Sequence, residues 1–367
     1  MSDANTPAPA LKEIFNRERL HHIAEQTLAV YPAFDSKAFL DRAAKDLDGL
    51  SLMQRLNRVS QSLHAGLPQD YPAALDILFQ LAPRLNSGFV TLILPEYVAL
   101  YGQHDFQRSM QALKFFTAFG SSEFAVRHFL RSNLEQGLAL MHQWSLDEDP
   151  HVRRLASEGS RPRLPWSFRL EKLVADPTPV LDILDNLKAD DSLYVRKSVA
   201  NHLNDITKDN PDWVLDQIEA WPLDNRHTAW IARHALRSLI KKGDPRALTL
   251  MGAGEQAKVR IEGLSVTPNA IHLGERISLS FTLTSTSDAH QRLIIDYAIH
   301  YVKKTGGTSA KVFKLKTLEL AARQSVTVSR EQQIRNFTTR VHYAGRHEVD
   351  VLINGQCLGR SGFDLAE

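Results

Sequence analysis

The chain has 367 residues, a length that excludes a single ordinary core. Of these residues 43% are hydrophobic and 23% are charged, a composition that excludes pervasive disorder. Its formal net charge is only +2, and no stretch approaches the roughly 18 consecutive apolar residues that a membrane span needs. The single cysteine, Cys357, cannot form an internal disulfide, and no Cys/His cluster has zinc-site spacing, so we predict a reducing, cytoplasmic compartment and no metal.

The N-terminal two thirds of the chain is predicted to be helical. Its first ten residues are polar and rich in Pro and Ala, without the basic start and apolar run of a signal peptide. From Leu11 to about Leu250 the apolar residues recur with helical spacing, and no β-like alternation interrupts them. Helix starts are predicted near Ser36 (as a cap), Tyr71, Phe89, Phe106 and Ser122.

A weak internal repeat runs through this helical region, in the fragments 125–128, 151–154, 194–197 and 231–234. The last three carry Arg at spacings of 43 and 37 residues, which bracket the period of HEAT-type helix pairs. Asp149-Pro150 and Asp191-Ser192 precede two of the fragments, as helix N-caps do. We interpret the region as a helical-repeat solenoid with a long concave surface; an ordinary helical bundle with coincidental Val-Arg pairs is the alternative.

Near residue 258 the apolar period changes from helical to alternating. Residues 277–284 alternate strictly between apolar and polar, and residues 295–301 do the same before Gly306-Gly307. Residues 349–353 lead into Asn354-Gly355, a strong signal for a tight hairpin. Several short strands in about 110 residues are typical of a small immunoglobulin-like sandwich. We therefore predict a mainly α chain: a HEAT-like helical-repeat domain at 11–252, a linker at 252–254, and an all-β domain at 258–367.

Charge is unevenly distributed along the chain. From residue 258 onward there are 15 Lys and Arg against 10 Asp and Glu, which leaves 29 against 32 in the preceding residues. Within that acidic part, residues 151–169 form a basic island that holds five arginines and only one acid, Glu158. Such a cluster can bind phosphates even when the global charge is near neutral, although a solvated surface face is the more common reading of a charge run.

Three carboxylates stand out by their position. Glu158 precedes Gly159 and falls in the last turn of a predicted helix, where an acid opposes the helix dipole; Asp205 also falls near a helix end. Glu123 follows Ser121-Ser122 and is predicted in a first turn, where an acid is favourable for structural reasons alone. Periodicity by itself favours ordinary solvated acids at these positions.

Three segments that contain these acids resemble a known family. Residues 122–129, 153–166 and 195–205 are similar to the AlkC branch of the AlkC/AlkD superfamily of bacterial DNA-alkylation-repair glycosylases. The string Glu-Gly-Ser-Arg-Pro-Arg-Leu-Pro-Trp at 158–166 is the most specific of them. The resemblance covers the helical region and the appended β domain, which AlkD relatives lack.

The resemblance implies an activity. Members of this branch are monofunctional glycosylases that hydrolyse the N-glycosidic bond of adenine or cytosine alkylated at N3 in duplex DNA and so start base excision repair. They act without rotating the base into a tight pocket. We therefore expect an enzyme without a cofactor, a monomer in the bacterial cytosol whose partner is alkylated double-stranded DNA.

The resemblance also assigns residues to roles. Glu123 and Asp205 are expected to stabilise the cationic sugar of the transition state or to orient the attacking water. Glu158 and Trp166 are expected to complete the pocket. The arginines expected to contact phosphates are Arg154, Arg161 and Arg163.

The β domain is expected to contact DNA from another side through lysines of one hairpin. Lys303 and Lys304 are the candidates, with Lys311, Lys314 and Lys316 nearby in the sequence. The alternative is that these lysines only protect an edge strand from aggregation.

Two other functions remain open at the level of sequence. A non-catalytic helical-repeat scaffold predicts an exposed apolar groove without clustered carboxylates. A DNA-binding protein without catalysis predicts that the acids are lost, which the presence of Glu123 and Asp205 opposes.

Overall fold

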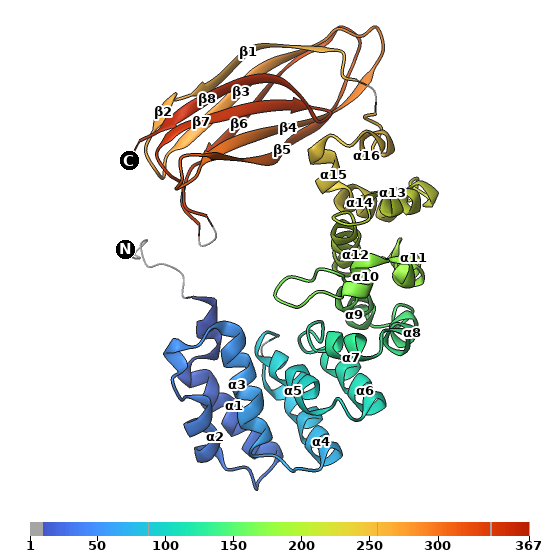
Figure 1. Cartoon of the computed structure of the whole chain (residues 1–367), viewed down its shortest axis with the longest axis vertical. Helices are drawn as coiled ribbons and strands as arrows, with labels where there is room; N and C mark the ends of the chain where they lie inside the picture. Colours follow the sequence, from blue (N-terminus) through green and yellow to red (C-terminus); the bar gives the residue numbers. More distant parts are fainter. Residues whose placement is uncertain (1–9, 87, 255, 338–339, 367) are drawn as a thin grey trace. The chain divides into compact units, whose positions relative to one another are not determined.

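A computed structural model of the chain describes residues 10–86, 88–254, 256–337 and 340–366 (Figure 1). Residues 1–9 lie outside the described residues. They make up most of the N-terminal segment for which we predicted no signal peptide. The chain forms two compact units. The first comprises the residues up to Trp213 together with Trp221–Ala235, and the second comprises Val214–Ala220 and the residues from Leu236 onward. In the described part of the chain, no helix combines the length and the apolar character needed to cross a membrane.

The first unit is built from helices that stack in two layers. In one layer α3 packs against α5, α5 against α7, α9 against α12 and α12 against α14; in the other, α4 packs against α6 and α8 against α11. This confirms the predicted helical-repeat solenoid. The bounds are α1 Arg17–Val30, α2 Ser36–Ala43, α3 Leu52–His64, α4 Tyr71–Leu81, α5 Ile93–Tyr101, α6 Phe106–Phe116, α7 Val126–Ser132, α8 Leu134–Trp144, α9 Pro150–Gly159, α10 Glu171–Ala175, α11 Leu181–Leu187, α12 Leu193–Ile206 and α14 Arg226–Ala235, with 3-10 turns at Leu11–Phe15, Leu47–Gly49, Ala82–Arg84, Val90–Leu92 and Thr178–Val180.

Helix starts follow local capping chemistry. The side chain of Asp149 accepts a hydrogen bond from the first turn of α9, with Pro150 at its first position, as the sequence predicts. The cap of α2 is Asp35 and not Ser36, because the carboxylate of Asp35 accepts from the backbone of Ala38. Two starts lie later than predicted: a 3-10 turn precedes α5, and a turn precedes α7.

Two of the four repeat fragments, those at 151–154 and 194–197, have a structural role in common. Arg153 of α9 donates to the backbone carbonyls of residues 147 and 148, just before its own helix. Arg196 of α12 donates in the same way to the carbonyls of residues 190 and 191. Each arginine therefore satisfies carbonyls of the loop that enters its helix, which explains why the residue recurs with the period of the helix pairs.

The second unit contains a sandwich of two sheets, with strand orders β1-β3-β6 and β2-β8-β7-β4-β5. The predicted immunoglobulin-like fold class is confirmed. Asn354 and Gly355 both have positive φ and form the predicted tight turn between β7 and β8. The bounds are β1 Val259–Thr267, β2 Ala270–Ile271, β3 Arg276–Ser285, β4 Gln291–Val302, β5 Thr308–Leu320, β6 Ser325–Gln333, β7 Gly345–Ile353 and β8 Gln356–Leu365.

The strands differ in how they are buried. In β3, Ile277, Leu279, Phe281 and Leu283 are buried in alternation, as predicted. In β4 the predicted inward residues are buried, but so are residues 294, 296 and 298 between them. The strand is therefore covered on both faces. Burial raises the pKa of Asp296, and the charges of Lys314 and of Lys241, in α15 (Arg237–Lys242), partly oppose this.

Three helices group with the sandwich: most of α13 (Pro211–Ala220), α15 (Arg237–Lys242) and α16 (Pro245–Leu250). The predicted linker at 252–254 begins with the residues that end α16. Gly252 has φ +71°, and the amide of the buried Ala253 donates back to the carbonyl of Leu248. The domain limits at 252 and 258 remain a prediction, although the change from helix to strand does fall between Leu250 and Val259.

Candidate active site

The candidate acids come from the turn before α7 and from the helices α9 and α12. Glu123 lies in the turn before α7, Glu158 in the last turn of α9 and Asp205 in the last turn of α12. Because α9 packs directly against α12, acids at the ends of these helices are brought side by side. Glu158 and Asp205 are buried, with 6% and 4% of their surface exposed.

An alternating chain of ion pairs joins these acids, and we call it the charge row. It begins at Glu123, which accepts from Arg154 at 2.6 Å and from the Ser121 hydroxyl at 2.7 Å. The other end of the Arg154 guanidinium lies 3.6 Å from Glu158. Burial opposes the charge of Arg154, but the two carboxylates beside it raise its pKa. The charge row comprises Glu123, Arg154, Glu158, Arg161, Asp205 and Lys208.

Arg161 continues the row and bridges the two buried acids. It donates to Glu158 Oε1 at 2.6 Å and to Asp205 Oδ2 at 2.8 Å. The Ser198 hydroxyl donates to the other oxygen of Glu158 at 2.5 Å, and Lys208 donates to the other oxygen of Asp205 at 2.7 Å. All four oxygens of Glu158 and Asp205 are therefore held by donors, and such buried charges are tolerated only when they are paired in this way.

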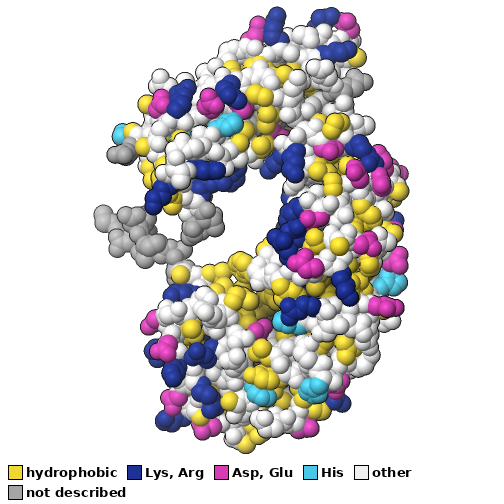
Figure 2. All heavy atoms as spheres, viewed as in Figure 1, with side chains coloured by type: hydrophobic (Ala, Val, Ile, Leu, Met, Phe, Trp, Pro, Cys, Tyr) yellow, Lys and Arg dark blue, Asp and Glu magenta, His cyan; other side chains and the backbone are white. Residues whose placement is uncertain are grey.

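A cleft of about 440 Å³ opens along this row. Glu123, Glu158 and Trp166 line it, whereas Asp205 reaches it only through Arg161. Trp166 is 63% exposed and has φ +65°, a left-handed conformation that a bulky residue rarely adopts. Strain of this kind persists where the surroundings impose it and is common at functional sites. In the space-filling view, basic side chains gather over the part of the first unit that contains α9 and α12 (Figure 2).

The basic island is largely neutralised by acids from other elements. Arg153 pairs with Asp190 at 2.7 Å, and Arg163 forms a two-pronged pair with Asp209 at 2.6 Å. These bonds raise the pKa of Arg163 and lower that of Asp209. Arg169 is exposed. The island is thus a set of oriented ion pairs, and its contacts with phosphate remain a prediction.

The lysines predicted to touch DNA lie in the second unit. Lys303 and Lys304 follow β4 in the turn that leads into β5, and they line a shallow depression of about 290 Å³ together with Arg340 and Tyr343. Lys311, Lys314 and Lys316 are exposed on β5, which is an edge strand of its sheet. Edge protection is thus a sufficient reason for the last three lysines, but it does not account for the two at the turn.

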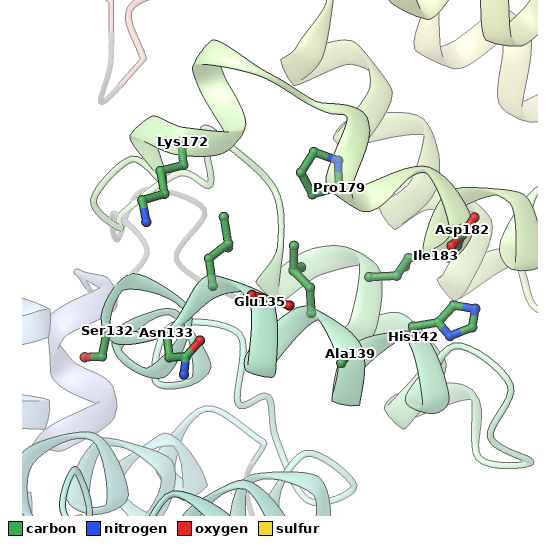
Figure 3. Close-up of a pocket in the computed structure, with 11 residues that line it drawn as sticks. Ser132, Asn133, Glu135, Ala139, His142, Lys172, Pro179, Asp182 and Ile183 are labelled. Carbon is green, nitrogen blue, oxygen red and sulfur yellow. The ribbon is translucent and has the colours of Figure 1, made fainter.

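Another depression, of about 600 Å³, lies among α8, α10 and α11 (Figure 3). Its charged residues are Glu135, Lys172 and Asp182, and Lys172 and Asp182 lie toward opposite ends in the close-up. Since its lining contains none of the predicted site residues and no gathered acids, it does not match the chemistry that the sequence predicts.

Sequence reasoning missed one member of the charge row, Lys208, and two residues that contact the row, Tyr194 and Ser198. Tyr194 lies under the Arg154 guanidinium, 4.7 Å from ring centroid to Cζ, and also lines the cleft. Burial raises the pKa of Tyr194. Ser198 donates a hydrogen bond to Glu158, and Lys208 donates one to Asp205. Tyr194 lies in the repeat fragment 194–197 and Ser198 in the family-like segment 195–205, and the signal that could have found them is that they share a helix with Asp205.

Comparison with known proteins places these features in a family. A family model described as "DNA alkylation repair enzyme" matches residues 107–239, and one described as "Uncharacterised protein YhaZ, C-terminal Ig-like domain" matches residues 260–367. A solved structure of Pseudomonas fluorescens alkylpurine DNA glycosylase AlkC, bound to DNA containing an abasic site analog, is 65% identical, covers 98% of this chain and 100% of that chain, and has a TM-score of 0.95. The chain belongs to the AlkC family of DNA alkylation repair proteins.

Another relative is the "Uncharacterized protein YhaZ" of Bacillus subtilis (strain 168). It is 42% identical over 347 residues, which are 94% of this chain and 96% of the relative. The family assignment therefore extends over both units of the chain and confirms the resemblance seen in the sequence. The residues matched by the DNA alkylation repair model include the whole charge row.

Proposed function

We propose that this chain is a monofunctional DNA glycosylase that hydrolyses the N-glycosidic bond of N3-alkylated adenine and cytosine in duplex DNA. The observation that carries the proposal is the charge row, which holds Glu123, Glu158 and Asp205 beside a cleft rimmed by an exposed tryptophan. The AlkC relative that was solved with DNA supports DNA as the partner. The rival scaffold function predicted no such gathering of acids.

The chemistry needs negative charge more than it needs a strong acid. Alkylation at N3 makes the base cationic, so that it leaves as a neutral molecule when the glycosidic electrons return to its ring. The sugar left behind is an oxocarbenium-like cation, and a fixed carboxylate stabilises it as its charge develops. Water then bonds to the sugar carbon and loses its proton to a carboxylate. We assign these roles to Glu123 and Asp205, with Glu158 supporting both through shared arginines.

The free protein balances its own acids, and this suggests how the substrate enters. Three carboxylates face three basic side chains in the charge row. The electrostatic attraction between the row and a cationic base is therefore strongest if one of these basic side chains moves away from its carboxylate. Lys208 is the most accessible candidate, because half of its side chain is exposed while its Asp205 partner is buried. A DNA phosphate can draw Lys208 or Arg154 from its carboxylate and leave that oxygen free for the substrate cation.

The three arginines predicted to contact phosphates are not equally placed for it. Arg163 is the most accessible to solvent, with 21% of its side chain exposed. Arg154 can exchange a carboxylate for a phosphate at the cleft. Arg161 is buried and serves two acids at once, which favours a role in orienting Glu158 and Asp205 over direct contact with DNA.

We also propose that the damaged base is reached without rotation into a closed pocket, in a monomer that needs no cofactor. Trp166 supports this, because its indole projects from the rim of the cleft and can lie against a sugar or a cationic base in bent DNA. The expected DNA contacts of Lys303 and Lys304 belong to the same proposal.

The decisive experiment is incubation of the full chain with duplex DNA that carries N3-methyladenine or N3-methylcytosine, followed by chromatography of the released bases. We expect release of both free methylated bases and an abasic site in the strand, without strand cleavage. Binding of the duplex without release of either base would instead support the non-catalytic DNA-binding function. Release of one base alone would restrict the proposed substrates to that base.

A further inference from the structure

One motif from the sequence is not used by the proposed reaction. Arg127, in the repeat fragment at 125–128, is fully buried in α7. Its guanidinium extends to the loop that follows α9. One nitrogen donates to the carbonyls of Gly159 at 3.0 Å and Arg161 at 2.5 Å, and another donates to the carbonyl of Phe168 at 2.5 Å.

These three carbonyls bracket one short segment, which we call the 160–167 loop. The loop carries Arg161, which bridges the two buried acids, and Trp166, which rims the cleft. Its backbone includes the left-handed conformation of Trp166, which is unfavourable unless the ends of the loop are held. Arg127 holds both ends at once, because Gly159 and Arg161 lie at the start of the loop and Phe168 follows its end.

Burying this cation has an evident cost. Burial, with Arg161 as a second cause, lowers the pKa of Arg127 to about 10, while Asp205, Glu158 and Glu123 partly offset the effect. Those acids act on Arg127 through space, since its hydrogen bonds in the described residues go to carbonyls. A planar guanidinium can serve three carbonyls at fixed angles, which a lysine ammonium on a flexible stem cannot do.

We propose that Arg127 is a positioning residue for the glycosylase reaction, acting through the 160–167 loop to place Arg161 between Glu158 and Asp205 and to place Trp166 at the rim of the cleft. The inference rests on the proposed function for its catalytic consequence, but the hold on the loop can be measured without DNA. It predicts that Arg127 matters for the rate of excision at saturation and little for binding, since Arg127 itself is buried and Arg163, the phosphate candidate on the loop, is held separately by Asp209.

The chain offers a matched control in Arg55. It is also fully buried and also donates to backbone carbonyls, those of Lys12 and Phe15, and it pairs with the Glu13 carboxylate as well, so it holds the segment at Leu11–Phe15. None of these residues lines the cleft. Arg127→Lys and Arg55→Lys therefore impose the same chemical change in two buried clamps, only one of which carries site residues.

The experiment compares the two lysine variants with the unaltered full chain. Hydrogen–deuterium exchange without DNA reports on each clamp, and gel shifts and single-turnover excision at saturating N3-methyladenine duplex separate affinity from rate. For Arg127→Lys we expect faster exchange over residues 159–169, affinity unchanged within about twofold, and excision slowed about 10- to 100-fold, the scale of a misplaced catalytic group. Arg55→Lys should loosen residues 11–16 and leave excision intact.

Two results would overturn the inference. One is unaltered excision by Arg127→Lys despite faster exchange in its loop; the other is an equal loss of excision in Arg55→Lys, which would point to general destabilisation. Failure of the unaltered chain to release any methylated base would refute the proposed function instead, and loop exchange in Arg127→Lys would still decide whether this arginine holds the loop.

Discussion

Arg161 donates to Glu158 and Asp205 through different nitrogens of one guanidinium, and both acids are buried. Removing one member of such a buried group leaves an uncompensated charge, which typically costs about 3–5 kcal/mol. At the scale of single residues, the site is therefore best tested by substitutions that keep the shape of a side chain while they change its charge. Carboxamides in place of carboxylates keep the shape and remove the charge, while their NH2 group stands where one carboxylate oxygen accepted a hydrogen bond.

Asp205→Asn and Glu123→Gln should each slow excision by about 100-fold or more, since each removes one preorganised charge from the developing sugar cation. Duplex affinity should not fall, because the phosphate contacts are made by other residues and loss of a carboxylate frees Arg154 or Lys208 for a phosphate. Single-turnover rates at saturating methylated duplex and gel-shift affinities measure the two effects separately. Excision by both variants at the unaltered rate would contradict the catalytic assignment.

His202 gives the first unit a pH dependence. It is fully buried in α12, and burial, followed by the charge of Arg161, lowers its pKa to about 3. As the pH falls below about 6.5 the unfolded chain takes up this proton while the folded chain does not, so stability present above pH 6.5 is lost progressively toward pH 3.

The His202 contribution can be isolated by substitution. From pH 7.5 to 5.0 it should remove about 2 kcal/mol from the free energy of unfolding. In His202→Gln that part of the pH dependence should disappear, whatever the absolute stability of the variant. Urea unfolding at the two pH values measures it, and an identical pH dependence in both proteins would contradict the assignment.

At the scale of elements, the segment after α9 combines buried and accessible cations. Arg161 points inward to the acids, whereas Arg163 is more accessible and is held by Asp209, which follows α12. The two arginines are only two residues apart, so their different environments come from the path of the loop between α9 and α10. An accessible cation at this position is suited to a phosphate once its own carboxylate is given up.

Arg163→Ala should weaken binding to methylated and unmethylated duplexes alike and reduce the log–log salt dependence of affinity by about one unit. Asp209→Asn should act in the opposite direction, because it frees Arg163 for a phosphate. Salt titrations of duplex affinity for the two variants provide the comparison. Unchanged salt dependence in both would assign this ion pair a purely structural role.

At the scale of the whole molecule, the residues from 258 onward carry five more positive than negative charges, while the preceding part has a small acidic excess. An uneven distribution of this kind steers a polyanion toward one region of a protein. The attraction should weaken as salt increases, because the screening length shortens.

Combined Lys303→Ser and Lys304→Ser substitutions in the full chain should lower duplex affinity and reduce its log–log salt dependence by about two units. Excision at saturating DNA should persist, because the charge row is untouched. Lys311→Ser with Lys316→Ser on the edge strand β5 is the matched control and should change affinity less. Equal losses in the two double variants would indicate a general charge effect without a specific contact at the turn.

The sequence by itself determined those features that depend on neighbours a few residues away. The alternation of residues 277–284 specified the buried face of β3, Asn354-Gly355 specified the hairpin turn, and Asp149-Pro150 specified the start of α9. Each of these follows from side-chain period, turn conformation or capping, which act within one turn or strand. The family resemblance added the identities of the acids, but not their partners.

Only the tertiary structure decided how the charges are paired. Arg154 meets Glu123 across 31 residues, and Arg161 meets Asp205 across 44, because stacked helices bring their ends together. The same is true of the second face of β4, which is buried where its sequence predicted a half-exposed strand. Periodicity shows which side of an element is apolar, but the partner of each charge depends on which elements pack side by side. That is why, in a run of arginines that suggested an open phosphate surface, Arg154 and Arg161 hold three acids in place. Arg153 and Arg163 pair with other aspartates.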